Sequence, residues 1–207
     1  MALAAMTFKF WTDSNLTVAF SNLFQLQRYT DLSDGAQDFV LYFGSDQPTG
    51  DRQCLAVSNP GVDNITLTPT DNLAAWQASH AYVVGDRIEP TTPNTYSYQC
   101  TVAGTSAASE PTWPTTPLGS TVTSGGATFT LLAKKHPTTE IKLALSSIGL
   151  DSAVAGAALN LGTQILSGSA NAVPVYFRFT NTVVTVSDDT GYPELSIDVN
   201  SIKEVVV

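Results

Sequence analysis

The chain has 207 residues and a formal net charge of −9; 43% of its residues are hydrophobic and only 13% are charged. These proportions supply one sizeable core and exclude a coiled coil or a charge-rich disordered tail. The nine basic residues are scattered, whereas nucleic-acid binding needs clustered Lys and Arg. No apolar run approaches the roughly 18 residues of a membrane span. We therefore expect no nucleic acid and no membrane among its partners.

The first third of the chain predicts short strands separated by turns. Strands in proteins are short runs of β-branched and aromatic residues bounded by turn residues. Asn59, Pro60 and Gly61 are turn residues of this kind. The runs that fit a strand are residues 8–11, 16–20, 39–43, 53–57 and 65–68.

The last third continues the pattern. Residues 139–145 alternate strictly, with Ile141, Leu143 and Leu145 on one face. Pro174 indicates an edge position for its strand, because proline cannot donate to a ladder. The Ala-rich residues 152–159 predict a loop or a single turn, since the nearby glycines disfavour a helix. The other expected strands are residues 159–166, 173–179, 183–186 and 195–199.

Strands at this spacing predict an all-β chain with an immunoglobulin-like or jelly-roll-like β-sandwich. The sandwich is interrupted by residues 72–136, which hold five of the 11 prolines and only three acidic and three basic residues. An insertion at a loop tip between adjacent strands costs little free energy. We therefore expect residues 1–71 and 137–207 to form one discontinuous domain, and residues 72–136 to form a small inserted domain.

The inserted segment predicts a sheet of three strands. Val83 and Val84 lead into a turn at Gly85-Asp86, and Arg87 and Ile88 leave it. The second and third strands are expected at residues 96–102 and 127–132. Because so short a domain buries little area, its aromatic side chains must supply most of the core.

The motifs of this segment occur in a characteristic order. They are Trp76, Ala81-Tyr82, Gly85-Asp86, Pro90-Thr-Thr-Pro-Asn94, Tyr96-x-Tyr98-x-Cys100, Ala103-Gly-Thr-Ser106, Glu110-Pro-x-Trp113-Pro and Gly126-x-Thr128. The order resembles small β modules of tailed-bacteriophage tail and fibre proteins, and is similar to chitin-binding carbohydrate modules of secreted hydrolases. Phe129 stands where these modules often carry a tryptophan. The remainder of the chain resembles small phage virion proteins in residues 58–63 and 157–175.

Carbohydrate binding is one reading of the aromatic residues in the insert, because aromatic faces stack on the C–H groups of sugar rings. The other reading makes Trp76, Tyr82 and Trp113 the core of the small domain. Tyr96 and Tyr98 lie two residues apart and so share one face of a strand; they are the pair most expected to be exposed. The candidate carbohydrate-binding residues are Trp76, Tyr82, Tyr96, Tyr98 and Trp113.

Other chemistry has less support, and neither a metal nor a cofactor is expected. His80 and His136 have no partners at metal-ligand spacing, and Asp86 fits a turn. Asp188 and Asp189 indicate a solvated hairpin more strongly than a calcium loop. Cys54 and Cys100 predict two free thiols. No nucleophile elbow or phosphate-binding loop is present, and nothing pairs the scattered glutamates Glu89, Glu110, Glu140, Glu194 and Glu204.

The resemblance implies a non-enzymatic structural protein of a tailed-phage virion, assembled in the bacterial host cytoplasm. We expect an exposed capsid decoration protein whose insert projects outward. The alternative is a tail or baseplate adhesin that binds a host polysaccharide or receptor. Partners would be other virion proteins and further copies of the chain, and the resemblance implies a trimer. The candidate contact residues are Val173, Pro174, Val205, Val206 and Val207, and we expect the C-terminal valines to pair with a sheet or a neighbour.

Overall fold

The computed structural model describes residues 6–21, 35–180 and 194–207. Within these residues the chain is all-β, as predicted, and its only α-helix is the single turn α1 (Gly149–Ser152). The chain divides into two compact units. The host unit comprises Met1–Thr70, Thr138–Asn181 and Ser196–Val207, and the inserted unit comprises Asp71–Pro137 and Thr182–Leu195.

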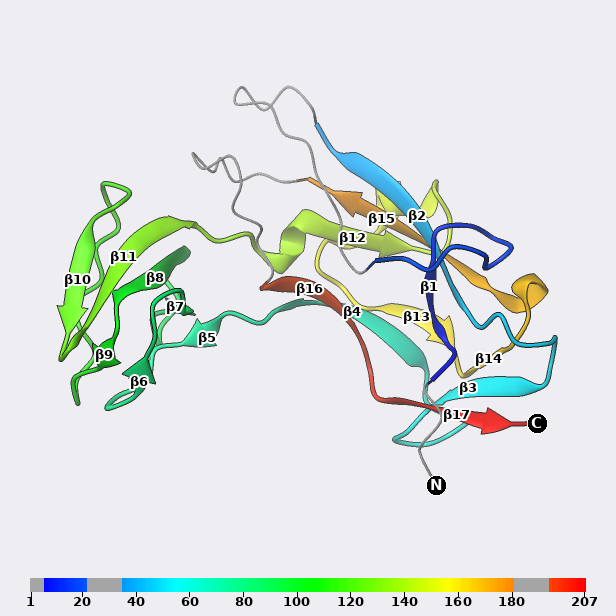
Figure 1. Ribbon diagram of the computed structural model, residues 1–207. Helices are drawn as coiled ribbons and strands as arrows, with labels where there is room; N and C mark the ends of the chain where they lie inside the picture. The colour runs from blue at the N-terminus through cyan, green and yellow to red at the C-terminus, as the bar shows by residue number, and fades with distance from the viewer. Residues whose placement is uncertain (1–5, 22–34, 181–193) are drawn as a thin grey trace. The chain divides into compact units, whose positions relative to one another are not determined.

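One layer of the host unit is a four-stranded antiparallel sheet (Figure 1). Along the central strand β15, alternate residues Val175, Phe177 and Phe179 are buried, so this face of the sheet is directed into the core. The strands are, in spatial order, β1 (Lys9–Trp11), β2 (Gln37–Gly44), β15 (Val173–Phe179) and β12 (Ile141–Ala144).

The other layer consists of two three-stranded sheets that share continuous stretches of chain. Strands β13 (Leu159–Gly162) and β14 (Gln164–Leu166) follow each other directly, and so do β16 (Leu195–Val199) and β17 (Ile202–Val206). These strands flank β4 (Ile65–Asp71) in the first sheet and β3 (Arg52–Ala56) in the second. The sheet orders are β13-β4-β16 and β14-β3-β17.

Asn200 spans the break between these two sheets. Its side-chain oxygen accepts the backbone N–H of Thr66 at 3.0 Å, and its amide donates to the carbonyl of Asn64 at 3.0 Å. The carbonyl of the next residue, Ser201, accepts from the backbone N–H of Val57 at 2.9 Å. These bonds satisfy backbone groups at the point where the ladder would otherwise leave them unpaired.

The host core lies between the two layers, which makes this unit a β-sandwich (Figure 1). The four-stranded sheet contributes Leu41, Phe43, Ile141, Leu143, Val175, Phe177 and Phe179 to the buried set, and the second layer contributes Cys54, Leu55, Ala56, Ile65, Leu67, Leu161 and Ile165.

The inserted unit has more strands than the three expected. Its main sheet has five strands in the order β10-β11-β8-β7-β5, and β6 (Ala81–Tyr82) pairs separately with β9 (Gly104–Thr105). All neighbours are antiparallel except β5 and β7. The five strands are β5 (Ala74–Ala75), β7 (Arg87–Glu89), β8 (Tyr96–Val102), β10 (Thr121–Ser124) and β11 (Ala127–Lys134).

Four expected strands differ from the structure. Residues 139–145 begin in the 3-10 turn Thr138–Glu140, so only Ile141–Ala144 form β12. Residues 159–166 divide into β13 and β14, which belong to different sheets. Residues 16–20 form only an isolated bridge at Ala19, because the Asp13 carboxylate accepts the backbone N–H groups of Thr17 and Val18 and folds this segment into a loop. Val83 and Val84 are 62% and 65% exposed and belong to a turn. The expected strand at residues 183–186 lies outside the described residues.

Candidate functional site

The buried core of the inserted unit includes three of the five aromatic residues proposed for sugar binding. Trp76 and Tyr82 are each 5% exposed, and Tyr98 is 0% exposed. The expectation that Tyr96 and Tyr98 form an exposed pair is wrong, because their strand face packs onto this core. The indole N–H of Trp76 is buried and has no hydrogen-bond partner within the described residues.

Tyr98 is held in place through its hydroxyl group. The hydroxyl accepts from the Asn94 side-chain amide at 2.8 Å and donates to the carbonyl of Pro114 at 2.8 Å. Its ring centroid lies 4.5 Å from that of Trp113. Burial raises the pKa of the Tyr98 phenol despite the bond from Asn94. Tyr98 therefore serves as a packed and hydrogen-bonded core residue.

Glu110 explains the Glu110-Pro-x-Trp113 motif. Its carboxylate accepts the Trp113 indole N–H at 2.9 Å, the backbone N–H of Thr91 at 2.8 Å and the Thr91 hydroxyl. Burial raises the pKa of Glu110, but these hydrogen bonds outweigh burial and lower it overall. The motif thus orients the Trp113 ring, whose centroid lies 5.5 Å from that of Phe129.

Of the five candidate residues, Tyr96 and Trp113 are the two that are only partly buried. Phe129, at the position where the modules it resembles often have tryptophan, is 0% exposed. Stacking on a sugar needs an accessible ring face. Any sugar platform of this kind would therefore rest on Tyr96 and Trp113.

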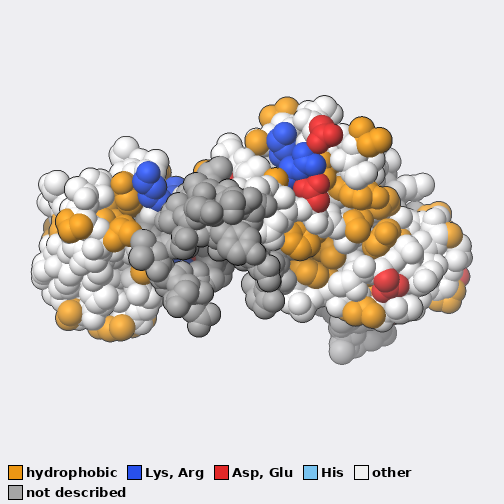
Figure 2. Space-filling model, turned by 90° about the horizontal axis from the view of Figure 1, so that it is seen from above, with side chains coloured by type: hydrophobic (Ala, Val, Ile, Leu, Met, Phe, Trp, Pro, Cys, Tyr) orange, Lys and Arg blue, Asp and Glu red, His pale blue; other side chains and the backbone are white. Residues whose placement is uncertain are grey.

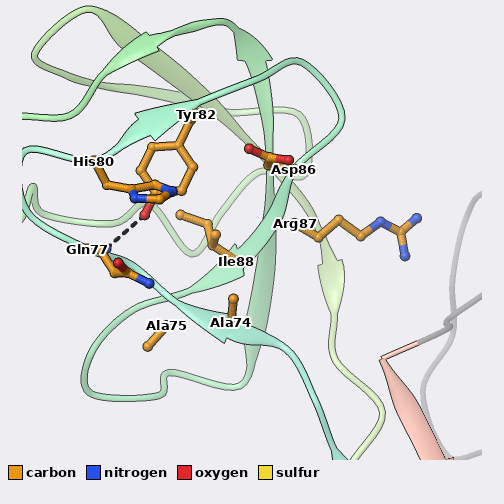
Figure 3. Close-up of a pocket in the computed structure, with 8 residues that line it drawn as sticks. All are labelled: Ala74, Ala75, Gln77, His80, Tyr82, Asp86, Arg87 and Ile88. Atoms are coloured by element: carbon orange, nitrogen blue, oxygen red, sulfur yellow. Dashed lines mark hydrogen bonds between the residues drawn. The ribbon is translucent and has the colours of Figure 1, made fainter.

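A separate hollow of about 230 Å³ lies beside β5, β6 and β7 (Figure 3). The rings of His80 and Tyr82 meet edge to face on one side, with centroids 4.7 Å apart. The Tyr82 hydroxyl accepts the backbone N–H of Gln77 at 2.8 Å. In Figure 3 the Arg87 side chain points away from these residues. The hollow is lined by Ala74, Ala75, Gln77, His80, Tyr82, Asp86, Arg87 and Ile88.

Asp86 is confirmed as a turn residue. Its carboxylate accepts the backbone N–H of Val83 at 2.8 Å, and its own N–H donates to the Val83 carbonyl at 3.2 Å. Gly85 provides the positive φ of 102° that the turn requires. The position of Asp86 at the hollow is thus a consequence of the turn.

The candidate assembly residues have different surroundings. Strand β15 is central, so the expected edge position of its proline is wrong. Pro174 is tolerated because it lies beyond the end of β12, where β15 pairs with β2 alone in the described sheet. The C-terminal valines pair with a sheet, as predicted: Val205 and Val206 oppose Gln53 and Arg52 of β3, and the Val207 N–H donates to Asp51 at 3.0 Å.

The glutamates, which the sequence shows as scattered, each have different surroundings in the structure. Glu89 binds Lys135, Glu194 binds Arg87, Glu204 binds Arg52, and Glu140 is buried. No three metal-ligating side chains gather within the described residues. Asp188 and Asp189 lie outside those residues.

Both cysteines are free, as predicted, and both are buried. Burial, together with the charge of Glu204, raises the pKa of Cys54 to about 12, so its thiol is protonated at neutral pH. None of the described helices is long and apolar enough to cross a bilayer.

Comparison of the chain with protein-family models, with curated proteins and with solved structures finds no match. The geometry of its own residues is therefore the basis for assigning a role.

Sequence reasoning missed the hollow because its lining comes from several short segments. Ala74 and Ala75 lie on a two-residue strand that pairs in parallel with β7, and no local pattern signals such a strand. Gln77 and His80 stand in the connection that follows. The one available signal was the alternation Arg87-Ile88-Glu89, which correctly buries Ile88 between two charged residues.

Proposed function

We propose that this chain is a non-enzymatic structural protein of a tailed-phage virion, and specifically an exposed capsid decoration protein. In this role the host unit attaches to the particle and the inserted unit faces outward. The partners would be the major capsid protein and further copies of the chain, and assembly would take place in the bacterial host cytoplasm.

The observation that carries this proposal is the insertion of a complete small β unit into a β-sandwich. The buried cluster of the inserted unit consists of its own residues. The two ends of its Asp71–Pro137 stretch are joined by an ion pair between Asp71 and Lys135 at 2.6 Å. A host sandwich can therefore carry such a unit without rebuilding its own core.

The character of the surface also supports an assembly role. Charged side chains are few on the face shown in Figure 2, in keeping with their 13% share of the chain. Strand β17 lies at the end of its described sheet order, and Val206 and Val207 are 76% and 71% exposed. Exposed apolar residues on an edge strand favour contact with another chain.

Immunogold labelling of intact particles tests the location. The antibody is raised against residues 73–133, and a matched antibody against residues 157–175 of the host unit serves as the control. We expect the first antibody to label the whole head and the control to label it weakly or not at all. Label at the tail tip alone would replace decoration with the adhesin role, and no label on purified particles would contradict a virion protein.

The second candidate function is an adhesin that binds a surface polysaccharide. It is favoured by the partly exposed rings of Tyr96 and Trp113, which lie on one small unit. Binding of soluble bacterial polysaccharides is measured for the Tyr96→Ala and Trp113→Ala variants. Tyr176→Ala, a change at a partly buried tyrosine of the host unit, is the control. Loss of binding in the first two variants alone would support the adhesin role.

A further inference from the structure

The base of the inserted unit holds a compact group of charges centred on Lys135. Its ammonium group lies 2.6 Å from a carboxylate oxygen of Asp71 and 2.6 Å from one of Glu89. All three side chains are 13–18% exposed. Asp71 is the first residue of the unit and Lys135 lies two residues before its exit at Pro137. One lysine therefore joins the entering and the leaving segments.

Strand β7 binds both this charged group and the chain at Glu194, which belongs to the other segment of the inserted unit. Arg87 and Glu89 are two residues apart and so share one face of β7, opposite the buried Ile88. Glu89 binds Lys135, and Arg87 binds the carboxylate of Glu194 at 3.3 Å. The carbonyl of Glu194 also accepts the backbone N–H of Asn72 at 2.8 Å.

The burial of these groups makes Lys135 hard to replace. Burial lowers the pKa of Lys135, but the hydrogen bonds to Asp71 and Glu89 outweigh it and raise the pKa overall. Without the ammonium group, two partly buried carboxylates would lie close together with no cation between them. Removal of one partner from such a group costs far more than the loss of an exposed surface pair.

We infer that this charged group acts as a lock, which holds together the two ends of the Asp71–Pro137 stretch. While the lock is intact, the inserted unit unfolds only as one cooperative body, and it does so separately from the host unit. The inference goes beyond the proposed function, since it concerns how the unit folds wherever the protein acts. Its second support is the buried cluster from Trp76 to Leu131, which draws only on residues of the inserted unit.

Native-state hydrogen exchange of the full chain, followed by mass spectrometry, tests the lock. Exchange of core amides reports the opening equilibrium of each unit. In Lys135→Met we expect amides of β8 and β11 to exchange roughly 10- to 100-fold faster than in the unchanged protein, while those of β2 and β15 keep their rates. Lys134→Met removes the neighbouring exposed lysine and is the matched control, expected to change neither set.

Two outcomes would overturn the inference. Equal acceleration in β2–β15 and β8–β11 would mean that the units open together. Acceleration in Lys135→Met no greater than in Lys134→Met would mean that the charges do not close the unit. Glu89→Gln keeps the lysine and its bond to Asp71, so it serves if Lys135→Met does not fold; a smaller acceleration confined to the inserted unit is expected, and an unselective one overturns the inference.

Discussion

The two units are both built mainly from antiparallel strands, yet they achieve a core in different ways. The host unit packs two layers whose buried faces are mainly aliphatic and phenylalanine side chains. The inserted unit is smaller, and its core depends on aromatic rings, among them Tyr98 and Tyr82, whose hydroxyl groups are hydrogen-bonded. A small unit buries too little area to rely on apolar packing alone. Hydrogen bonds to the aromatic side chains and close backbone contacts must supply the rest of the stabilisation.

The largest effects should come from truncating one buried ring in each unit. Phe177→Ala in the host unit and Phe129→Ala in the inserted unit each remove a ring that is at most 1% exposed. Each should cost about 3–5 kcal/mol in its own unit. Hydrogen exchange of β2–β15 and of β8–β11 measures the two costs separately. A loss shared equally by both units would show that the division into two cores has no energetic meaning.

The second largest effect concerns a close backbone contact in the inserted unit, between Gly104 and Gly126. A Cβ atom at Gly104 would lie 2.3 Å from the carbonyl group of Gly126, whereas one at Gly126 would find no neighbour nearer than 3.6 Å. Gly104→Ala should therefore lower the stability of this unit by about 3 kcal/mol. Gly126→Ala, across the same contact, should cost less than about 1 kcal/mol. Hydrogen exchange of the β8 and β11 amides, measured with rising temperature, gives the stability lost in each variant. Equal losses in Gly104→Ala and Gly126→Ala would contradict the crowding at Gly104 alone.

The third difference between the units is the Glu110 carboxylate, which holds the Trp113 ring by a hydrogen bond. Glu110→Ala leaves the N–H groups of Thr91 and Trp113 without their acceptor and should cost about 1–3 kcal/mol. Glu110→Gln retains an acceptor oxygen and should cost less. Near-ultraviolet circular dichroism of the tryptophans, recorded with thermal unfolding, is the measurement. If both variants lose the same stability, the charge rather than the hydrogen bonds holds the ring.

The smallest expected effect concerns an acid-dependent contact of the host unit. Glu204 accepts the N–H and hydroxyl of Thr7 and binds Arg52. Burial raises the pKa of Glu204, but these bonds outweigh it and lower the pKa overall. Because the folded pKa is the lower one, the stabilisation is complete above the ordinary glutamate value of about 4.3. It is lost as the pH falls through the folded value.

Glu204→Gln should remove this part of the pH dependence and cost about 1 kcal/mol at neutral pH. Asp198→Asn, at an exposed position of β16, is the control. The free energy of unfolding of the host unit is measured from neutral pH into the acid range. An unchanged acid dependence in Glu204→Gln would show that other carboxylates set the acid stability of the host unit.

The sequence by itself determined the fold class, and most strands that periodicity could reveal. The strands expected at residues 173–179 and 195–199 are β15 and β16, with the same bounds. Residues 96–102 likewise form β8. These segments succeed because the strand pattern of a short run is a local property that follows from burial of its side chains. The change of composition at residues 72–136 lies within the second unit, which also includes Thr182–Leu195, a segment that composition did not distinguish.

Only the tertiary structure decided which aromatic rings are exposed to solvent and which strands lie at the edge of a sheet. Tyr96 and Tyr98 share a strand face, but burial of that face depends on β11 and on Trp113, which come later in the chain. Pro174 lies on a central strand because β12 ends before reaching it. The two-residue strand β5 and the lock at Lys135 depend on residues that are 14 to 64 positions apart. Such contacts leave no periodic signal, because each is set by the packing of distant segments.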